Sequence, residues 1–320
     1  MCSTRLQDLI RDYLITISLS SHTNQWLQRG ISYLQNCICQ LNNIFMKKII
    51  APVDFSEPAV NAAKYAVQLA ADLPDSAVTL YYVYETIIAG SDGTPLLIDP
   101  DARKNVAIVA LNNLRNELKS VATVPIEVVA EEGRLAPCLE KYVKQQGADL
   151  IVMGITGSSK IEQLIIGSNT LNVISKDICP VFIIPGNATY KKINRAIFTS
   201  DLKNVESTTP LRPLKKALDL LQPELYVVHV TTTHAAVPEA ELEEKKKLEP
   251  LLKDYNPHFF FVLEENFTAA VDKFAEEYSA DVIITVPRKH SFLSSLFKSS
   301  NTKKLAYHSS LPILALHSWE

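Results

Sequence analysis

The sequence predicts an α/β fold made of two tandem, doubly wound parallel sheets of five strands each, with helices on both faces. Three observations predict it. From residue 46 onward, apolar runs of strand length alternate with segments of helical periodicity, as in parallel sheets covered by helices. The stretch GITGSSKIEQLIIGSN at 154–169 directly follows the apolar run 148–153, as a phosphate-binding loop follows its strand. The same order of elements then returns in the second half.

The duplication is visible in the spacing of equivalent residues. Ile151 and Ile283 are 132 positions apart, and so are Asn169 and Asn301. No glycine occurs between residues 187 and 320, so the second copy of the loop has lost all three of its glycines. The equivalent positions are Gly154 and Val286, Gly157 and Lys289, and Gly167 and Ser299. In the first copy, Gly154 and Gly157 are expected to let the main chain turn with positive φ and bring its N–H groups close to a ligand. The chain therefore has one phosphate loop and one relic of it.

The first half begins with an apolar run at 48–53, which predicts a strand. Ser56 is a typical N-cap and precedes a helix expected at 57–71, and Gly147 ends a later helix. The remaining strands are expected at 77–84, 125–130, 148–153 and 181–184, and the remaining helices at 101–120, 135–146 and 168–176.

The second half repeats this pattern. Strands are expected at 195–200, 224–230, 258–263, 282–285 and 313–316, and helices at 207–221, 239–255, 267–279 and 302–308. Right-handed crossovers between the strands would make each half a doubly wound sandwich.

Residues 1–45 do not fit the duplication and are rich in Gln, Asn and Ser. Because a strand starts directly after Met46, we expect this N-terminal extension to be disordered or not translated. The alternative is a genuine extension that packs on the body or recruits a partner. The expected domains are then 46–187, which carries the phosphate loop, and 188–320, which carries the degenerate one.

Composition narrows the function classes. The formal net charge of −3 gives no basic footprint for nucleic acid, and no apolar run reaches the roughly 18–20 residues that span a bilayer. The five cysteines are scattered and odd in number, which favours reduced thiols in a cytoplasmic protein. Cys37 and Cys39 form a candidate metal or redox pair, but no His/Cys cluster that could complete a ligand set lies nearby.

Three motifs resemble the universal stress protein family. They are Val53-Asp54-Phe55-Ser56 after the first strand, the Gly-x2-Gly-x9-Gly-Ser loop after the fourth, and Cys179-Pro180-Val181-Phe182 at the fifth. The resemblance covers residues 46–320 as two copies and is stronger in the first. It implies a Rossmann-like sheet of the adenine nucleotide α-hydrolase type, with strand order 3-2-1-4-5. In that order ligands bind between strands 1 and 4, so Asp54 and Gly154 should meet at one crevice.

The resemblance also implies a ligand, ATP, accompanied by Mg²⁺ or Mn²⁺. Asp54 would lie near the ribose and base, Val83 would offer main-chain groups to the adenine, and Ser168 would donate its hydroxyl to a phosphate. The copies would pack through their fifth strands as an internal pseudo-dimer, and association between chains stays open. The implied binding residues are Pro52, Val53, Asp54, Val83, Met153, Gly154, Gly157, Gly167, Ser168 and Asn169.

The second copy departs from this pattern. Asp201 still follows its first strand, which would preserve an adenosine-like pocket, whereas bulk at Val286 and Lys289 would obstruct a triphosphate. The basic group at 288–290, with Lys298, is either a solvated loop or a site for another anion.

No set of nucleophile, base and orienting residue supports a turnover enzyme. His229, in a predicted strand, is either catalytic or structural, and we favour the structural interpretation; Cys138 and Cys179 are typical of small apolar fillers. We expect a nucleotide-dependent stress-response protein with at most slow, incidental hydrolysis. The alternatives are an ATP-using enzyme of the α-hydrolase type and a non-nucleotide interaction module. The sequence does not indicate the inducing stress or the protein partner.

Overall fold

A computed structural model describes residues 47–84, 100–155, 168–176, 178–231, 237–286 and 311–316. The predicted helix at 302–308 and most of the predicted phosphate loop lie outside these ranges. All of these described residues belong to one compact unit. No helix in the described ranges has the length and apolar character needed to cross a bilayer.

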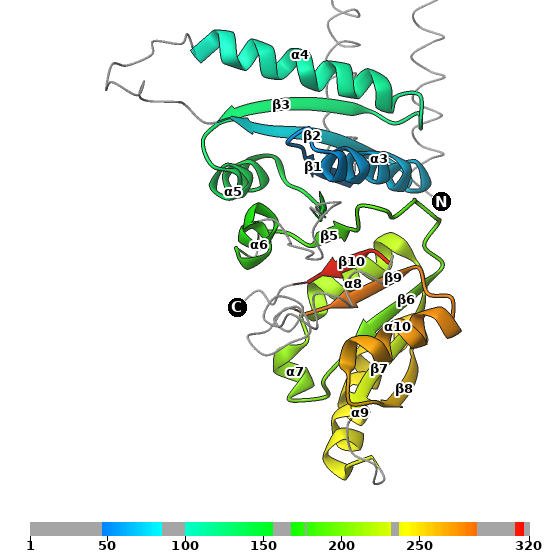
Figure 1. Ribbon diagram of the computed structural model, residues 1–320. Coiled ribbons are helices and arrows are strands. Elements are labelled where there is room, and N and C mark those ends of the chain that lie inside the picture. Colours follow the sequence, from blue (N-terminus) through cyan, green and yellow to red (C-terminus); the bar gives the residue numbers. More distant parts are fainter. Residues whose placement is uncertain are drawn as a thin grey trace, which may run out of the picture. The chain divides into compact units, whose positions relative to one another are not determined.

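The first half contains five strands and four helices in its described residues, and all of them except β4 are labelled in Figure 1. They are β1 (Lys47–Pro52), α3 (Glu57–Asp72), β2 (Ser76–Tyr84), α4 (Pro100–Leu118), β3 (Ile126–Glu132), α5 (Leu135–Gln146), β4 (Leu150–Gly154), α6 (Ser168–Ser175) and β5 (Val181–Ile184).

The second half repeats the alternation of strands and helices, with one helix divided in two. Its elements are β6 (Arg195–Thr199), α7 (Val205–Thr208), α8 (Leu211–Leu221), β7 (Glu224–Thr231), α9 (Glu239–Leu252), the 3₁₀ turn η1 (Lys253–Tyr255), β8 (His258–Leu263), α10 (Phe267–Glu277), β9 (Val282–Thr285) and β10 (Ile313–Ala315).

The single helix predicted at 207–221 is wrong. It is α7 followed by α8, with a break at Thr209 and Pro210. Thr209 is extended, with φ −89° and ψ 118°, because a residue that precedes proline is driven out of the helical region. The prediction at 239–255 was also too long, since its last three residues tighten into a 3₁₀ turn.

The described strands form one sheet in the order β3-β2-β1-β4-β5-β10-β9-β6-β7-β8. Each half has the predicted strand order 3-2-1-4-5 and is parallel throughout. The halves meet where β5 pairs antiparallel with β10, in the register Ile313 with Ile183, Leu314 with Phe182 and Ala315 with Val181. The predicted doubly wound α/β fold is therefore confirmed, with its two sheets joined edge to edge.

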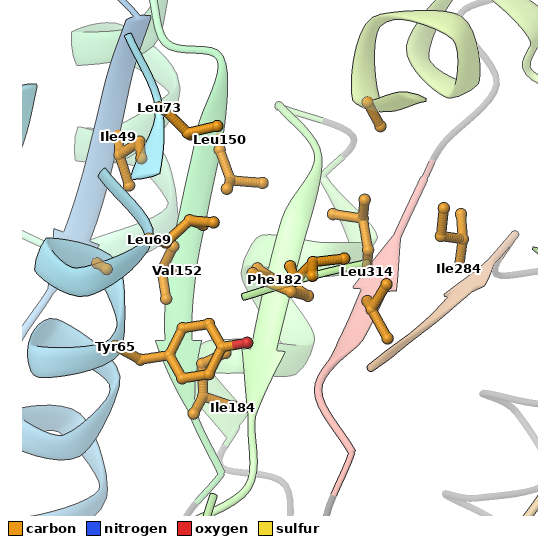
Figure 2. Close-up of a cluster of buried hydrophobic side chains, with 14 of the residues drawn as sticks. Ile49, Tyr65, Leu69, Leu73, Leu150, Val152, Phe182, Ile184, Ile284 and Leu314 are labelled. Atoms are coloured by element: carbon orange, nitrogen blue, oxygen red, sulfur yellow. The ribbon is translucent and has the colours of Figure 1, made fainter. Parts of the chain in front are cut away.

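Apolar side chains cover both faces of this sheet. One layer includes buried residues of α3, α4, α8 and α9, and the other includes buried residues of α5 and α6. Figure 2 shows part of the first layer, where Tyr65 and Leu69 of α3 pack over Val152 and where Phe182 and Leu314 lie on adjacent strands. Because this layer contains residues of both halves, the core continues across the β5–β10 junction.

Candidate nucleotide-binding site

A cleft lies at the carboxyl ends of β1 and β4, where the strand order reverses. These strands are neighbours, with Ile49 beside Leu150 and Ile50 beside Ile151. This is the position at which open α/β sheets bind ligands. The residues that line the cleft are Pro52, Val53, Asp54, Ser56, Pro58, Ala59, Tyr82, Val83, Leu135, Met153, Gly154, Asn169 and Thr170.

Seven of the ten residues that the family resemblance implied therefore lie around one cleft. They are Pro52, Val53, Asp54, Val83, Met153, Gly154 and Asn169. Ser168 opens α6 next to Asn169, but its side chain lies outside the described residues, as do Gly157 and Gly167. The sequence reasoning missed Tyr82 and Leu135, because an apolar or aromatic side chain near a strand or helix end resembles core.

Asp54 holds the turn between β1 and α3. Its Oδ1 accepts hydrogen bonds from the Ser56 main-chain N–H at 3.0 Å and from the Ser56 hydroxyl at 2.5 Å. Between them Phe55 has φ +63°, a left-handed conformation that costs a non-glycine residue about 1 kcal/mol. Ser56 is the N-cap residue as predicted, but its hydroxyl donates to Asp54 rather than capping the helix. The carboxylate is thereby fixed at the edge of the cleft.

Gly154, the last residue of β4, has a different reason for being glycine from the one the sequence suggested. We expected a positive φ there, and this was wrong: positive-φ glycines in the described residues are Gly133 and Gly147. A β carbon at position 154 would instead lie 2.3 Å from the carbonyl oxygen of Pro58, in the first turn of α3. Glycine is needed because the strand end and the helix N-terminus approach each other directly.

The main chain of Val83 faces the cleft. Successive residues of a strand direct their N–H and C=O groups to alternate neighbours. The Tyr81 carbonyl accepts from Val53 of the β1 side at 2.9 Å, and the Tyr84 carbonyl accepts from Gly133 of the β3 side at 3.0 Å. The N–H and C=O groups of Val83 therefore point toward β1. The β1–β2 pairing ends at Pro52 and Tyr81, so Val83 lies two residues beyond the last paired residue of β2. Its main-chain N–H and C=O are thus a donor and an acceptor, side by side, for the edge of a planar ligand.

The first turn of α6 closes the cleft opposite α3. Asn169 and Thr170 both line it, and the Thr170 hydroxyl donates to the Gly154 carbonyl at 3.4 Å, linking the helix to the end of β4. The N–H groups and the dipole at a helix N-terminus favour an anion. Asp54 is the one acidic side chain among the described lining residues, and none of them is basic. The cleft thus combines an acceptor at one end with an anion-favouring helix end at the other.

The second half has the same turn, but different side chains surround it. Ser200 N–H donates to the Val228 carbonyl as Val53 does to Tyr81, so Asp201 and His229 occupy the positions of Asp54 and Tyr82. Asp201 accepts from Lys203 N–H at 3.3 Å, and Leu202 has φ +48°. Val286, at the Gly154 position, is partly buried and packs against the core. Lys289 and the rest of the predicted basic group lie outside the described residues.

His229 is buried between β7 and α9. Its Nδ1 lies 2.9 Å from the Ser200 carbonyl oxygen, and its Nε2 lies 3.1 Å from Glu241 Oε2. Since a carbonyl can only accept, Nδ1 carries a proton. The remaining nitrogen faces the carboxylate of Glu241 without good hydrogen-bond geometry. These contacts tie the first turn of α9 to the strand and are those of a structural histidine.

The two cysteines in the described ranges have inert surroundings. Both are buried, and their thiols contact the carbonyls of Glu132 and Ala148 at 3.6 Å. Burial raises the pKa of the Cys179 thiol to about 12 and also raises the pKa of Cys138. No group of His, Cys, Asp and Glu within the described ranges could hold a metal ion. Both thiols therefore stay protonated and pack as small apolar side chains.

Comparisons with known proteins find relatives of the half that contains this cleft. The model of the universal stress protein family matches residues 46–185. Universal stress proteins MJ0531 and MJ0577 of Methanocaldococcus jannaschii are 29% and 26% identical over 154 and 156 residues. These alignments cover 48% and 44% of this chain, and 89% and 96% of the relatives.

A solved structure extends the likeness of fold to the second half. A universal stress protein from Archaeoglobus fulgidus superposes with a TM-score of 0.60 at 18% sequence identity. The superposition covers 85% of this chain and 98% of the Archaeoglobus chain. In sequence, residues 46–185 of this chain are therefore similar to the universal stress protein family.

Proposed function

We propose that the first half binds ATP in the cleft between β1 and β4, and that the nucleotide regulates the protein rather than serving as a substrate for rapid turnover. The observation that carries the proposal is the meeting of Asp54, Val83 and Gly154 at the point where the strand order reverses. Their separation of up to 100 residues along the chain makes this meeting independent of any local motif.

Each end of the nucleotide has a partner of suitable chemistry. The Asp54 carboxylate uses one oxygen for the Ser56 turn, and its remaining lone pairs can accept from ribose hydroxyls. The Val83 main chain supplies a donor and an acceptor for the edge of adenine. The N-terminus of α6 suits the phosphates, and the triphosphate would bring its own Mg²⁺ or Mn²⁺, since Mg²⁺ is usually held by substrate phosphates and few protein ligands.

The size of the cleft indicates which part of the nucleotide each group of residues binds. The described walls enclose about 160 Å³, whereas pockets for small molecules usually reach roughly 300 Å³ or more. We therefore assign the base and ribose to these walls, and the phosphates to Gly157, Gly167, Ser168 and Asn169. Of these four residues, Gly157, Gly167 and the Ser168 side chain lie outside the described part of the chain.

We further propose that the halves act as an internal pseudo-dimer. The antiparallel pairing of β5 with β10 and the shared apolar layer support this arrangement. Residues 46–187 and 188–320 would then be two related domains of which the first binds nucleotide. A conformational change caused by ATP would be transmitted to the second through this junction.

The test compares two equivalent aspartates. Asp54→Ala and Asp201→Ala each remove a carboxylate that holds the same kind of turn, so their structural cost should be similar. Isothermal titration with ATP and Mg²⁺ should show at least tenfold weaker binding for Asp54→Ala and unchanged affinity for Asp201→Ala. Equal affinities in the two variants, or no binding of ATP by the native chain, would refute the proposal.

The enzyme alternative is tested on the same protein. Nucleotide released from ATP is followed by chromatography, with and without small-molecule acceptors. A regulatory protein releases ADP slowly or not at all. Rapid formation of AMP and pyrophosphate with an acceptor would favour an ATP-using enzyme of the α-hydrolase type.

A further inference from the structure

An aromatic pair, Phe55 and Tyr82, lies at the rim of the cleft. The rings of Phe55 and Tyr82 lie 5.1 Å apart between centroids, tilted by 55°. Tyr82 is half-buried and lines the cleft, whereas Phe55 is 38% exposed, one of few large apolar side chains exposed in the described residues. Phe55 packs behind Tyr82 from a left-handed backbone position.

The second half shows that the turn alone does not explain the exposed ring. Leu202 has the same place and the same left-handed backbone as Phe55, yet it is 3% exposed. His229, at the Tyr82 position, is 6% exposed and contacts Glu241 of α9. The strained turn therefore belongs to the fold of both halves. The exposed aromatic pair, in contrast, belongs to the first half and lies beside its cleft.

The geometry of the strand end gives Tyr82 a function. Side chains of successive strand residues point to opposite faces of the sheet. Tyr82 packs with the α3 layer, whereas Val83 and Leu135 pack with the α5 layer. A flat ring whose edge meets the Val83 main chain at the end of the sheet would therefore lie between Tyr82 on one side and Leu135 on the other.

We infer that Tyr82, backed by Phe55, stacks on the base of the bound nucleotide and makes the site prefer purines. This inference rests on the proposed nucleotide site and adds the origin of its base preference. Stacking gains with ring area, so a two-ring purine gains more than a one-ring pyrimidine. The polar tip of tyrosine is not required, and phenylalanine should serve equally well.

The experiment uses the full chain with ATP and CTP, each with Mg²⁺, in isothermal titration. Tyr82→Leu should weaken ATP binding about tenfold and CTP binding less than threefold, while Tyr82→Phe changes neither. Tyr84→Leu is the matched control, because Tyr84 lies two residues further along the same strand and outside the cleft lining. The fluorescence of 2-aminopurine riboside triphosphate should be quenched by the native chain and by Tyr82→Phe, but much less by Tyr82→Leu.

The possible outcomes distinguish the stacking role of Tyr82 from the proposal that the cleft binds ATP. A native chain that binds no adenine nucleotide overturns both. A native chain that binds ATP, with a Tyr82→Leu variant of the same affinity, base preference and quenching, overturns the role of Tyr82 alone. Should circular dichroism show Tyr82→Leu unfolded, Phe55→Leu at the exposed rim takes its place. It should lose about threefold in ATP affinity, and an unchanged affinity would contradict the inference.

Discussion

Gly154 shows how one residue sets the width of the cleft. The end of β4 touches the first turn of α3, with the Pro58 carbonyl where a β carbon would be. A side chain at position 154 would have to displace main chain, which cannot swing aside as the tip of a side chain can. The second half has Val286 at this position, and its helix equivalent to α3 is divided into α7 and α8. The second half thus differs from the first both at the glycine position and in the helix that follows its first strand.

Gly154→Ala should therefore destabilise the fold by about 3 kcal/mol, the upper range for overpacking a buried site. Gly186→Ala is the control, because a β carbon there would meet nothing closer than the Ile155 carbonyl oxygen at 3.8 Å. Its effect should stay within about 0.5 kcal/mol. Urea denaturation of both variants measures the difference. Equal midpoints would show that α3 can move away from β4 at little cost.

At this scale the sequence predicted the residues at strand ends that match a family pattern. Asp54, Val83 and Gly154 were identified in this way. Tyr82 and Leu135 were missed, since nothing in their local sequence separates a cleft wall from a core position. The signal that could have found Tyr82 is its place beside Val83 at the end of β2, on the opposite face of the sheet. The positive φ expected at Gly154 was wrong because close packing against another element, unlike a turn, has no signature in the neighbouring sequence.

Strands and helices recur in the two halves with their supporting contacts. Asp149 and Asp281 stand before β4 and β9, and each accepts a main-chain N–H at the start of the adjacent first strand. The distances are 2.8 Å from Lys48 and 3.0 Å from Arg195. The strand order was predictable because this alternation is regular. The division of the helix at 207–221 was not foreseen, although Pro210 marks it.

Asp149 also makes a contact with the second half. The Nζ of Lys216, from α8 of the second half, lies 2.6 Å from Asp149 Oδ1, so this ion pair joins the halves. Its side chains are 54% and 25% exposed, and solvent therefore weakens it. A double-mutant cycle of Lys216→Met and Asp149→Asn should give a coupling of about 0.5 kcal/mol that decreases in 1 M salt.

A second cycle, of Lys216→Met with Asp281→Asn, is the control and should give no coupling. Both cycles are measured by urea denaturation at two salt concentrations. A zero value in the first cycle would mean that α8 is held against the first half by apolar packing alone.

For the molecule as a whole, the β5–β10 pairing turns two repeats into one folding unit. Phe182 and Leu314, each 1% exposed, lie opposite each other across this junction. The apolar layer that contains them extends from Ile49 in the first half to Leu248 in the second. Separating the halves would expose this surface to water at about 25 cal/mol per Å². Unfolding of one half should therefore be coupled to unfolding of the other.

Hydrogen exchange tests this coupling with two equivalent core leucines. Leu111 of α4 and Leu248 of α9 are both fully buried, one in each half and neither at the junction. Either leucine replaced by alanine should cost about 3 kcal/mol, which raises the population of the open state roughly a hundredfold. If the chain unfolds as one unit, Leu111→Ala accelerates exchange of the slowest amides in β6 as much as in β1, and Leu248→Ala does the same in reverse. Acceleration confined to the half that carries the substitution would mean that the junction is too weak to couple them, and that a signal from bound nucleotide could not cross it.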